Sequence, residues 1–233
     1  DTIAPKTPDA VFPNNWISFH QGGTIVTYPM YAPSRREERR LDIIQYFKDN
    51  FEVKNQLDLD RFEAEDLFLE GTGSMILDRD ARIAYACRSM RTDDNLFHDF
   101  CSKLDYKPVL FDSSDESEQP IYHTNVIMCV TTSQVIVCLE SVKDPGQLKM
   151  LKETILNSGK EIVDETYLSD VLDLNVFVDA ISTNNRSLLQ MPALSLQEGK
   201  PAEICVFDRA GKWVYDEKTN LSKALETSFI LDC

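Results

Sequence analysis

Short apolar runs separated by polar, turn-forming residues follow one another along much of the chain. Runs of this kind predict β-strands, over residues 25–28, 75–77, 83–86, 108–111, 126–130, 135–139 and 162–163. Apolar residues that recur every three or four positions predict α-helices, over residues 34–47, 94–104 and 147–158. Strands that alternate with helices indicate an α/β fold.

Two of the predicted helices carry signals at their ends. Ser34 is suited to cap the first helix, and Glu37 lies three residues on, as in a capping box. Gly159 follows the third helix, where glycine commonly ends a helix. The basic residues within 35–40 are interleaved with glutamates, which predicts a solvated face at the start of the first helix.

The pattern changes beyond about residue 165. Residues 168–189 have helical runs without a continuing series of strands and helices, and residues 196–215 are typical of a β-hairpin with an apolar first arm. This stretch of sequence does not repeat the earlier one. We therefore predict two segments, over residues 1–165 and 166–233, the second made of a small helix and a β-hairpin.

Composition and charge exclude several classes of protein. Hydrophobic residues make up 42% and charged residues 27% of the 233 residues, which is ordinary for a globular protein. A net charge of −15 argues against nucleic-acid binding, because neutralising phosphates needs clustered Lys and Arg. No apolar run approaches the roughly 20 residues that span a bilayer, so we expect no membrane partner. No signal peptide opens the sequence, and its start at Asp1, close to a motif, indicates a trimmed amino end.

The cysteines and histidines predict a reduced protein. Six cysteines are widely scattered and form no C-x-x-C pair, as expected in the cytoplasm. The three histidines, His20, His98 and His123, are isolated from one another and match no zinc-binding spacing. We therefore expect a cytoplasmic protein with no metal site and no cofactor.

Three short stretches gather a carboxylate, a histidine and several amides, over residues 9–15, 69–75 and 121–125. Glu70 precedes Gly71 and Gly73, and glycines let backbone approach a ligand closely. Taken alone, Glu70 is read as a surface acid and His123 as a polar residue at the start of a strand. The order of the three stretches along the chain favours a role for both residues in a functional site.

These stretches belong to a longer resemblance to the pentein superfamily of guanidine- and ureido-modifying enzymes, and most of all to its citrulline-utilisation hydrolase branch. The matching segments occur in the family order, over residues 7–20, 28–40, 68–79, 84–93 and 121–130. The resemblance implies a five-bladed α/β propeller. Residues 1–165 would supply only its middle blades, so we expect an incomplete propeller that lacks the opening and the closing blade.

Residues from about 170 to 231 resemble a different family, at the carboxyl-terminal end of dihydroorotases. That resemblance implies the last barrel helix and the strands after it. Dihydroorotase zinc ligands lie in the earlier barrel, which this chain does not contain. We therefore do not expect dihydroorotase activity.

The pentein resemblance implies hydrolysis of a linear ureido or guanidino amino acid, with citrulline to ornithine favoured. A thiolate attacks the planar carbon, and a histidine protonates the departing amine and then deprotonates water. A carboxylate holds the imidazole and stabilises its cationic form. By motif matching, His123 is the acid/base and Glu70 is the orienting carboxylate.

The charge of the expected clamp residues favours a neutral substrate. Arginine deiminases usually place aspartates where this chain has Asn15 and Asn125. Amides keep hydrogen bonding without negative charge, which suits a neutral ureido group; the alternative is that Asn14-Asn15 merely forms a turn. Arg91 lies within residues 89–92, which resemble the clamp for the substrate α-carboxylate. An ordinary surface ion pair is the alternative there.

The nucleophile is unassigned. Cys87, Cys129 and Cys138 fall in predicted strands of the wrong blades, and Cys205 falls in the predicted hairpin. Cys233 is terminal, as the family cysteine nearly is, but it lacks the glycine-rich segment that leads into that cysteine. It is a candidate on position alone.

Several hypotheses therefore stay open. The chain is a pentein-type hydrolase that lacks activity as it stands, or a non-enzymatic remnant that binds a ureido ligand or a protein partner. It is otherwise a dihydroorotase-related fragment without its zinc site, or a composite of two genes with no function of its own. The sequence predicts a small-molecule ureido or guanidino partner and leaves the oligomeric state open.

Overall fold

The computed structural model describes residues 7, 10 and 12–164 of the chain. The chain divides into two compact units, Asp1–Tyr167 and Leu168–Cys233, and all described residues belong to the first. The helix and hairpin predicted after residue 165 lie outside the described residues, together with Cys205 and Cys233.

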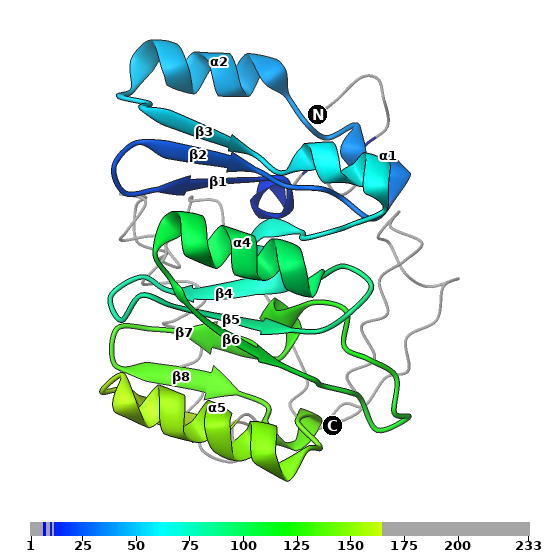
Figure 1. The fold of residues 1–233 in the computed structure, drawn as a ribbon, viewed down its shortest axis with the longest axis vertical. Helices are drawn as coiled ribbons and strands as arrows, with labels where there is room; N and C mark the ends of the chain where they lie inside the picture. Colours follow the sequence, from blue (N-terminus) through cyan, green and yellow to red (C-terminus); the bar gives the residue numbers. More distant parts are fainter. Residues whose placement is uncertain (1–6, 8–9, 11, 165–233) are drawn as a thin grey trace, which may run out of the picture. The chain divides into compact units, whose positions relative to one another are not determined.

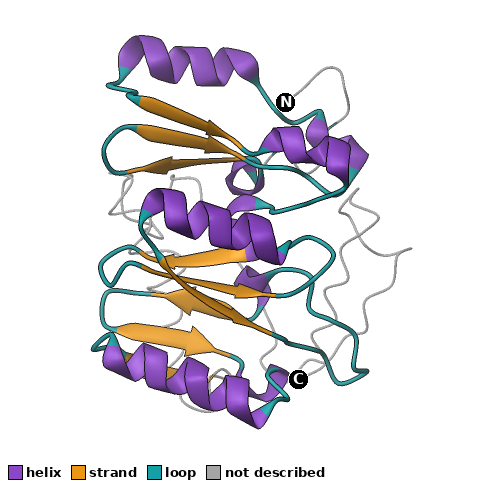
Figure 2. Ribbon diagram, in the orientation of Figure 1, coloured by secondary structure: helices purple, strands orange, loops and turns teal. Residues whose placement is uncertain are grey.

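Three successive ββαβ units make up the described chain (Figures 1 and 2). The first contains η1 (Pro13–Asn15), β1 (Ile17–His20), β2 (Thr24–Thr27), α1 (Pro33–Arg36), α2 (Leu41–Asn50) and β3 (Asn55–Asp58). The second contains η2 (Asp60–Glu65), α3 (Gly71–Ser74), β4 (Met75–Asp78), β5 (Ile83–Cys87), α4 (Asp94–Leu104) and β6 (Lys107–Phe111). The third contains η3 (Thr124–Val126), β7 (Met128–Val130), β8 (Gln134–Val137), η4 (Leu139–Ser141), α5 (Pro145–Asn157) and β9 (Glu161–Asp164).

Each unit forms its own three-stranded sheet with the same topology. The first two strands pair antiparallel, and the third returns parallel to the second. A parallel return needs a crossover connection, and the helices α2, α4 and α5 provide it. In the second sheet Met75 lies opposite Ala86, and Ile83 lies opposite Lys107.

Helix α4 packs between the first and the second sheet (Figure 1). The ring of Phe100 on α4 lies 5.7 Å from that of His20 and 6.0 Å from that of Tyr28, both in the first unit. The other partners of α4 include Ala84 and Ala86 of β5. Small side chains at these two positions leave room for the helix against the strand.

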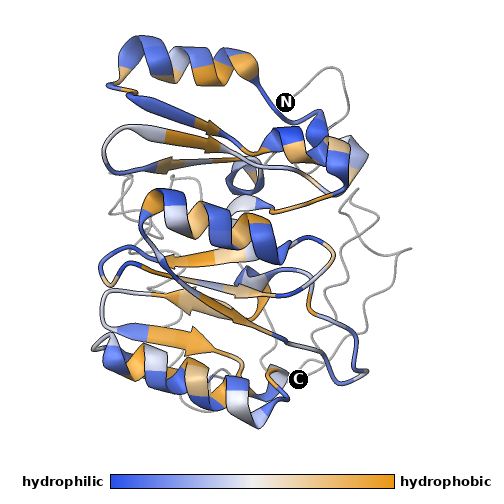
Figure 3. Cartoon of the chain, in the orientation of Figure 1, coloured by the Kyte–Doolittle hydropathy of each residue, from blue (hydrophilic) through white to orange (hydrophobic). Residues whose placement is uncertain are grey.

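Strand β5 is buried on both faces, because the alternate side chains of a strand point in opposite directions. Ile83, Tyr85 and Cys87 face a second core. Helix α5 contributes Leu151 and Ile155 to that core, and both are fully buried. Strands β7 and β8 line the same core. The strands β5, β7 and β8 are rich in hydrophobic residues for this reason (Figure 3).

The structure confirms the α/β class and most of the predicted elements. Six of the seven predicted strands correspond to β4–β9, the remaining one to β2, and the helices predicted over 94–104 and 147–158 correspond to α4 and α5. Strands β1 and β3 were not predicted from the sequence. Whether the blades close into a propeller stays a prediction.

The helix predicted over residues 34–47 is wrong as one continuous helix, because the chain forms the separate helices α1 and α2 there. Ala32 is the N-cap residue of α1, not Ser34, and proline occupies the first turn. Arg39, between the two helices, forms ion pairs with Asp60 and Glu63 of η2. These ion pairs with a later part of the chain keep the residues between α1 and α2 from joining one continuous helix.

The solvated face predicted for the basic cluster is also wrong for Arg35. Its side chain is buried and makes a two-point ion pair with Glu38, Nε to Oε1 at 2.9 Å and Nη2 to Oε2 at 3.0 Å. Two-point pairing of a guanidinium with a carboxylate is the arrangement that offsets the burial of both charges. No helix within residues 12–164 has the length and apolar character needed to cross a membrane.

Candidate active site

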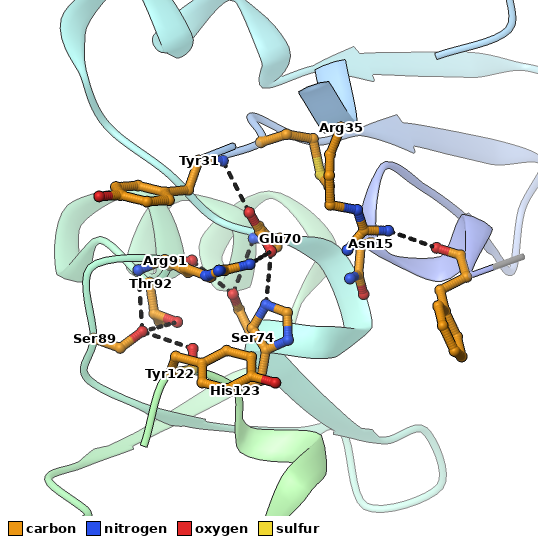
Figure 4. Close-up of polar contacts among 12 residues, drawn as sticks. Asn15, Tyr31, Arg35, Glu70, Ser74, Ser89, Arg91, Thr92, Tyr122 and His123 are labelled. Atoms are coloured by element: carbon orange, nitrogen blue, oxygen red, sulfur yellow. Dashed lines mark hydrogen bonds and ion pairs between the residues drawn. The ribbon is translucent and has the colours of Figure 1, made fainter. Parts of the chain in front are cut away.

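Equivalent loops of the three units meet at one place. Elements η1, α3 and η3 each precede the first strand of their unit, and α3 contacts both of the others. The loops that follow β2 and β5 carry Tyr31 and Arg91 to the same place (Figure 4). The repeat of the fold thus gathers side chains that are far apart in the sequence.

Two glycines allow this close approach. Gly71 has a left-handed φ of +46°, and a Cβ atom there would lie 2.3 Å from the carbonyl oxygen of Asn14. A Cβ atom at Gly73 would lie 2.7 Å from Oδ1 of Asn15 and 2.9 Å from Cε1 of His123. Any larger residue would therefore displace η1 or the histidine ring.

Glu70 and His123 form a buried hydrogen-bonded pair (Figure 4). The Nε2 atom of His123 lies 2.7 Å from Oε2 of Glu70. The other carboxylate oxygen, Oε1, accepts a hydrogen bond of 2.8 Å from the backbone N–H of Tyr31. The carboxylate of Glu70 is fully shielded from solvent. Its negative charge is therefore stabilised by these hydrogen bonds and not by water.

The environment favours an ionised Glu70 and a neutral His123. Burial raises the pKa of Glu70, but the hydrogen bond and charge of His123, the charge of Arg91 and the N–H of Tyr31 together lower it below its ordinary value. Burial is the main reason that the pKa of His123 is lowered; Glu70 opposes this effect, and Arg91 and Arg35 add to it. A neutral ring that donates from Nε2 has a free acceptor at Nδ1. That atom can take up a proton.

Arg91 lies beside the pair. Its Nη1 atom is 3.5 Å from Oε2 of Glu70. Its guanidinium lies between two aromatic rings in Figure 4, with Cζ 5.5 Å from the centroid of Tyr31 and 4.9 Å from that of Tyr122. Stacking on aromatic faces is a property of arginine that lysine does not share.

Hydroxyl groups hold the loops of the site together. Ser74 Oγ accepts from the N–H of Glu70 at 2.9 Å and donates to the carbonyl of Arg91 at 2.7 Å. Ser89 Oγ donates to the carbonyl of Tyr122 at 2.8 Å. Thr124 Oγ1 donates to the carbonyl of Ser74 at 2.6 Å and accepts from a backbone N–H of β5 at 2.8 Å. These bonds fix the backbone on both sides of the Glu70–His123 pair.

The structure brings together four of the residues singled out from the sequence. Asn15, Glu70, Arg91 and His123 surround α3, as described above. Asn125 lies two residues after His123 but is exposed at η3. Cys233 lies outside the described residues.

Sequence reasoning missed three groups at this site. Tyr31 and Tyr122 contact the Arg91 guanidinium, and the charge of Arg35 acts on His123. Tyr31 and Arg35 belong to residues 28–40, a segment that matches the pentein pattern. That match was the available signal, but the alternating charges there favoured a solvated helix instead.

One described cysteine, Cys87, is tied to the segment that carries His123. Its Sγ contacts the carbonyl of Ile121 at 3.4 Å and Oγ1 of Thr124 at 3.3 Å. Burial raises the pKa of the Cys87 thiol, which disfavours the nucleophilic thiolate. Within the same described residues, no group of three or more His, Cys, Asp and Glu side chains could hold a metal ion.

A cavity of about 840 Å³ adjoins the loop that carries Arg91. It shares Ser89, Thr92 and Tyr122 with the network around the Glu70–His123 pair, but neither member of that pair lines it. The cavity therefore lies beside the buried pair and does not enclose it.

The model of the eukaryotic N,N-dimethylarginine dimethylhydrolase family matches residues 1–194. The chain belongs to this family. It is thereby a member of the pentein superfamily, as the sequence motifs indicated. The match extends from the described unit into residues beyond 165.

Solved structures with the same fold include the arginine dihydrolase ArgZ from the ornithine–ammonia cycle in cyanobacteria. It is 21% identical, with a TM-score of 0.53, over 72% of this chain and 25% of that chain. The N-terminal domain of ArgZ, a cysteine-to-serine mutant bound to substrate, is 21% identical with a TM-score of 0.53, over 72% of this chain and 58% of that chain. Unliganded AgrE is 20% identical with a TM-score of 0.54, over 71% and 23%. This chain thus spans about a quarter of the full ArgZ chain.

A dihydroorotase of Aquifex aeolicus (strain VF5) is 30% identical over 63 residues. Those residues are 27% of this chain and 15% of the dihydroorotase. So short a match is a partial resemblance and does not place the chain in that family.

Proposed function

We propose that this chain carries the histidine–carboxylate part of a C–N hydrolase site for a linear ureido or guanidino amino acid. The observation that supports this most is the buried hydrogen bond between Glu70 and His123, with Arg91 beside it. A buried pair of titratable groups whose charges depend on each other is typical of catalytic sites. Membership of a dimethylarginine hydrolase family supports the same chemistry.

In the proposed reaction the neutral His123 ring first takes the proton of the thiol, and the thiolate so formed adds to the carbon of the ureido or guanidino group. For citrulline, the bond from that carbon to the δ-nitrogen breaks, and ornithine leaves with a proton that His123 supplies. Water, deprotonated by His123, then displaces the thiol and releases carbamate. Glu70 keeps the imidazole oriented and stabilises its cation while it carries the proton.

Citrulline is the substrate that the amide at Asn15 favours. The Asn15 side chain is buried near His123, and its amide offers a donor and an acceptor without charge. A neutral ureido group would leave no buried charge unpaired beside it. Asn125 is proposed as a second amide contact, and Arg91 as the partner of the α-carboxylate. Dimethylarginine is the competing substrate, because the matching family is described by it.

The nucleophile stays a proposal without an assigned residue, with Cys233 a candidate on position alone. Burial raises the pKa of the Cys87 thiol and makes it a poor nucleophile, which favours a second function: a protein that binds a ureido amino acid without turning it over. Binding would then use Arg91 and Asn15 as in the enzyme.

Turnover separates the two functions. The full chain is incubated with citrulline or dimethylarginine under reducing conditions, and ornithine or citrulline is quantified by mass spectrometry. The enzyme proposal expects product that disappears in His123→Ala and Cys233→Ser. Product that persists in His123→Ala would contradict the assigned acid/base. Saturable binding without product in the unaltered chain would leave the binding protein.

A further inference from the structure

We infer that Tyr122 is a positioning residue that holds the Arg91 guanidinium and the His123 imidazole at a fixed separation. Its ring centroid lies 4.9 Å from Cζ of Arg91 and 4.8 Å from the centroid of the His123 ring. This inference rests on the proposed function, in which Arg91 binds the α-carboxylate of the substrate and His123 is the acid/base. Tyr122 would keep these two residues aligned with each other.

The geometry of Tyr122 differs from that of a surface aromatic residue. Its backbone carbonyl accepts a hydrogen bond of 2.8 Å from Ser89 Oγ, in the same loop as Arg91. The next residue along the chain is His123. Tyr122 is therefore fastened to the Arg91 loop by its backbone and touches both functional side chains with its ring (Figure 4).

Tyr31 completes the arrangement from the first unit. Its ring lies over Arg91, with 5.5 Å from Cζ to the centroid, and meets Phe68 edge-on at 5.3 Å. Its backbone N–H donates to Glu70. Each tyrosine thus joins Arg91 to one member of the Glu70–His123 pair.

The side chains on either side of this contact are largely shielded from solvent. The Arg91 side chain is 12% exposed, and that of His123 is 7% exposed. Cation–π contact strengthens when the cation is desolvated. Without the Tyr122 ring, Arg91 has room to turn away from the site, and its charge would then act less on His123.

The test is a double-mutant cycle read by NMR titration of His123, which needs no substrate. The chain has three histidines, so His20 and His98 serve as internal controls for folding. The variants are Tyr122→Leu, Tyr122→Phe, Arg91→Gln and the double variant Tyr122→Leu/Arg91→Gln. Tyr122→Met replaces Tyr122→Leu if the latter does not fold.

Removing the ring is expected to raise the pKa of His123 by about 0.5 or more, because a nearby positive charge is withdrawn. Tyr122→Phe keeps the ring and is expected to leave the titration as in the unaltered chain. In the Arg91→Gln background, Tyr122→Leu should add nothing further. Additive effects, or an unmoved His123 in Tyr122→Leu, would overturn the inference.

Ligand binding distinguishes this inference from the proposed function. The Kd for citrulline is expected to rise about tenfold in Tyr122→Leu and to be unchanged in Tyr122→Phe. An unaltered chain that does not bind citrulline would remove the proposed function. The coupled titration would in that case still establish Tyr122 as the residue that positions Arg91 against His123.

Discussion

At the scale of single residues, Gly73 sets how closely an amide and an imidazole approach each other. Oδ1 of Asn15 and the ring of His123 lie where a side chain at position 73 would begin. The ring cannot shift freely, because its Nε2 is held by Glu70. A single methyl group therefore tests whether this packing matters for the site.

Gly73→Ala is expected to lower the free energy of unfolding by about 1–3 kcal/mol, as overpacking of a rigid site does. It should also abolish the binding of citrulline, because His123 and Asn15 must move. Chemical denaturation and calorimetric titration measure the two effects. Gly146→Ala is the matched control, since a Cβ there meets only a carboxylate oxygen at 3.1 Å. A Gly73→Ala variant as stable and as competent as the unaltered chain would show that the ring is not confined.

The partly buried side chain of His20 should make the free energy of unfolding depend on pH, independently of the candidate active site. Its Nε2 lies 2.7 Å from Ser18 Oγ, and its ring packs edge-on against Phe100. Burial, with the charges of Arg79 and Arg82, lowers the pKa of His20 from 6.5 to about 4. The folded state therefore favours the neutral ring.

A lowered histidine pKa means that the unfolded chain binds the proton first as pH falls. The stability that neutral His20 contributes is fully present above about pH 6.5 and is lost as pH falls towards 4. His123 acts in the same direction. Urea denaturation between these pH values should show a shallower loss of stability in His20→Gln than in the unaltered chain. His98→Gln, at an exposed position, is the control; equal profiles for all three proteins would refute this account.

At the scale of elements, the sequence predicts well where apolar side chains decide the structure. Strands β4 and β5 and helix α4 line continuous cores, and their apolar residues follow the period of each element. Strand β3 has the sequence Asn-Gln-Leu-Asp and is mostly exposed, so it has no such pattern. Its structure comes from parallel pairing with β2, which is a property of the fold.

The break between α1 and α2 could not be read from the sequence for a similar reason. Helical spacing continues through residues 34–47, and local propensity favours one helix. The partners of Arg36 and Arg39 are Asp60 and Glu63, more than twenty residues away. Tertiary contacts of this kind override local propensity.

The motif residues of the candidate site could be predicted from the sequence, but the residues that pack around them could not. Glu70 and His123 stand in recognisable segments, and the structure places them in contact. The roles of Tyr31 and Tyr122 depend on where their rings lie relative to Arg91. Such a three-way contact between separate units leaves no local signature in the sequence.

At the scale of the whole molecule, the residues proposed as acid/base, orienting carboxylate and clamp all belong to the described unit. The family match continues to residue 194, and Cys205 and Cys233 lie beyond that match. Whatever supplies the nucleophile, the proposed function requires that the described unit bind its ligand through Arg91 and Asn15. Ligand binding is the property to measure first.

The most direct measurement is differential scanning calorimetry of the full chain with and without millimolar citrulline, for the unaltered protein and for Arg91→Gln. A ligand that binds only the folded state raises the midpoint of unfolding. The account predicts one cooperative transition that citrulline raises in the unaltered chain and leaves unmoved in Arg91→Gln. A transition that citrulline does not move in either protein, or moves equally in both, would contradict it.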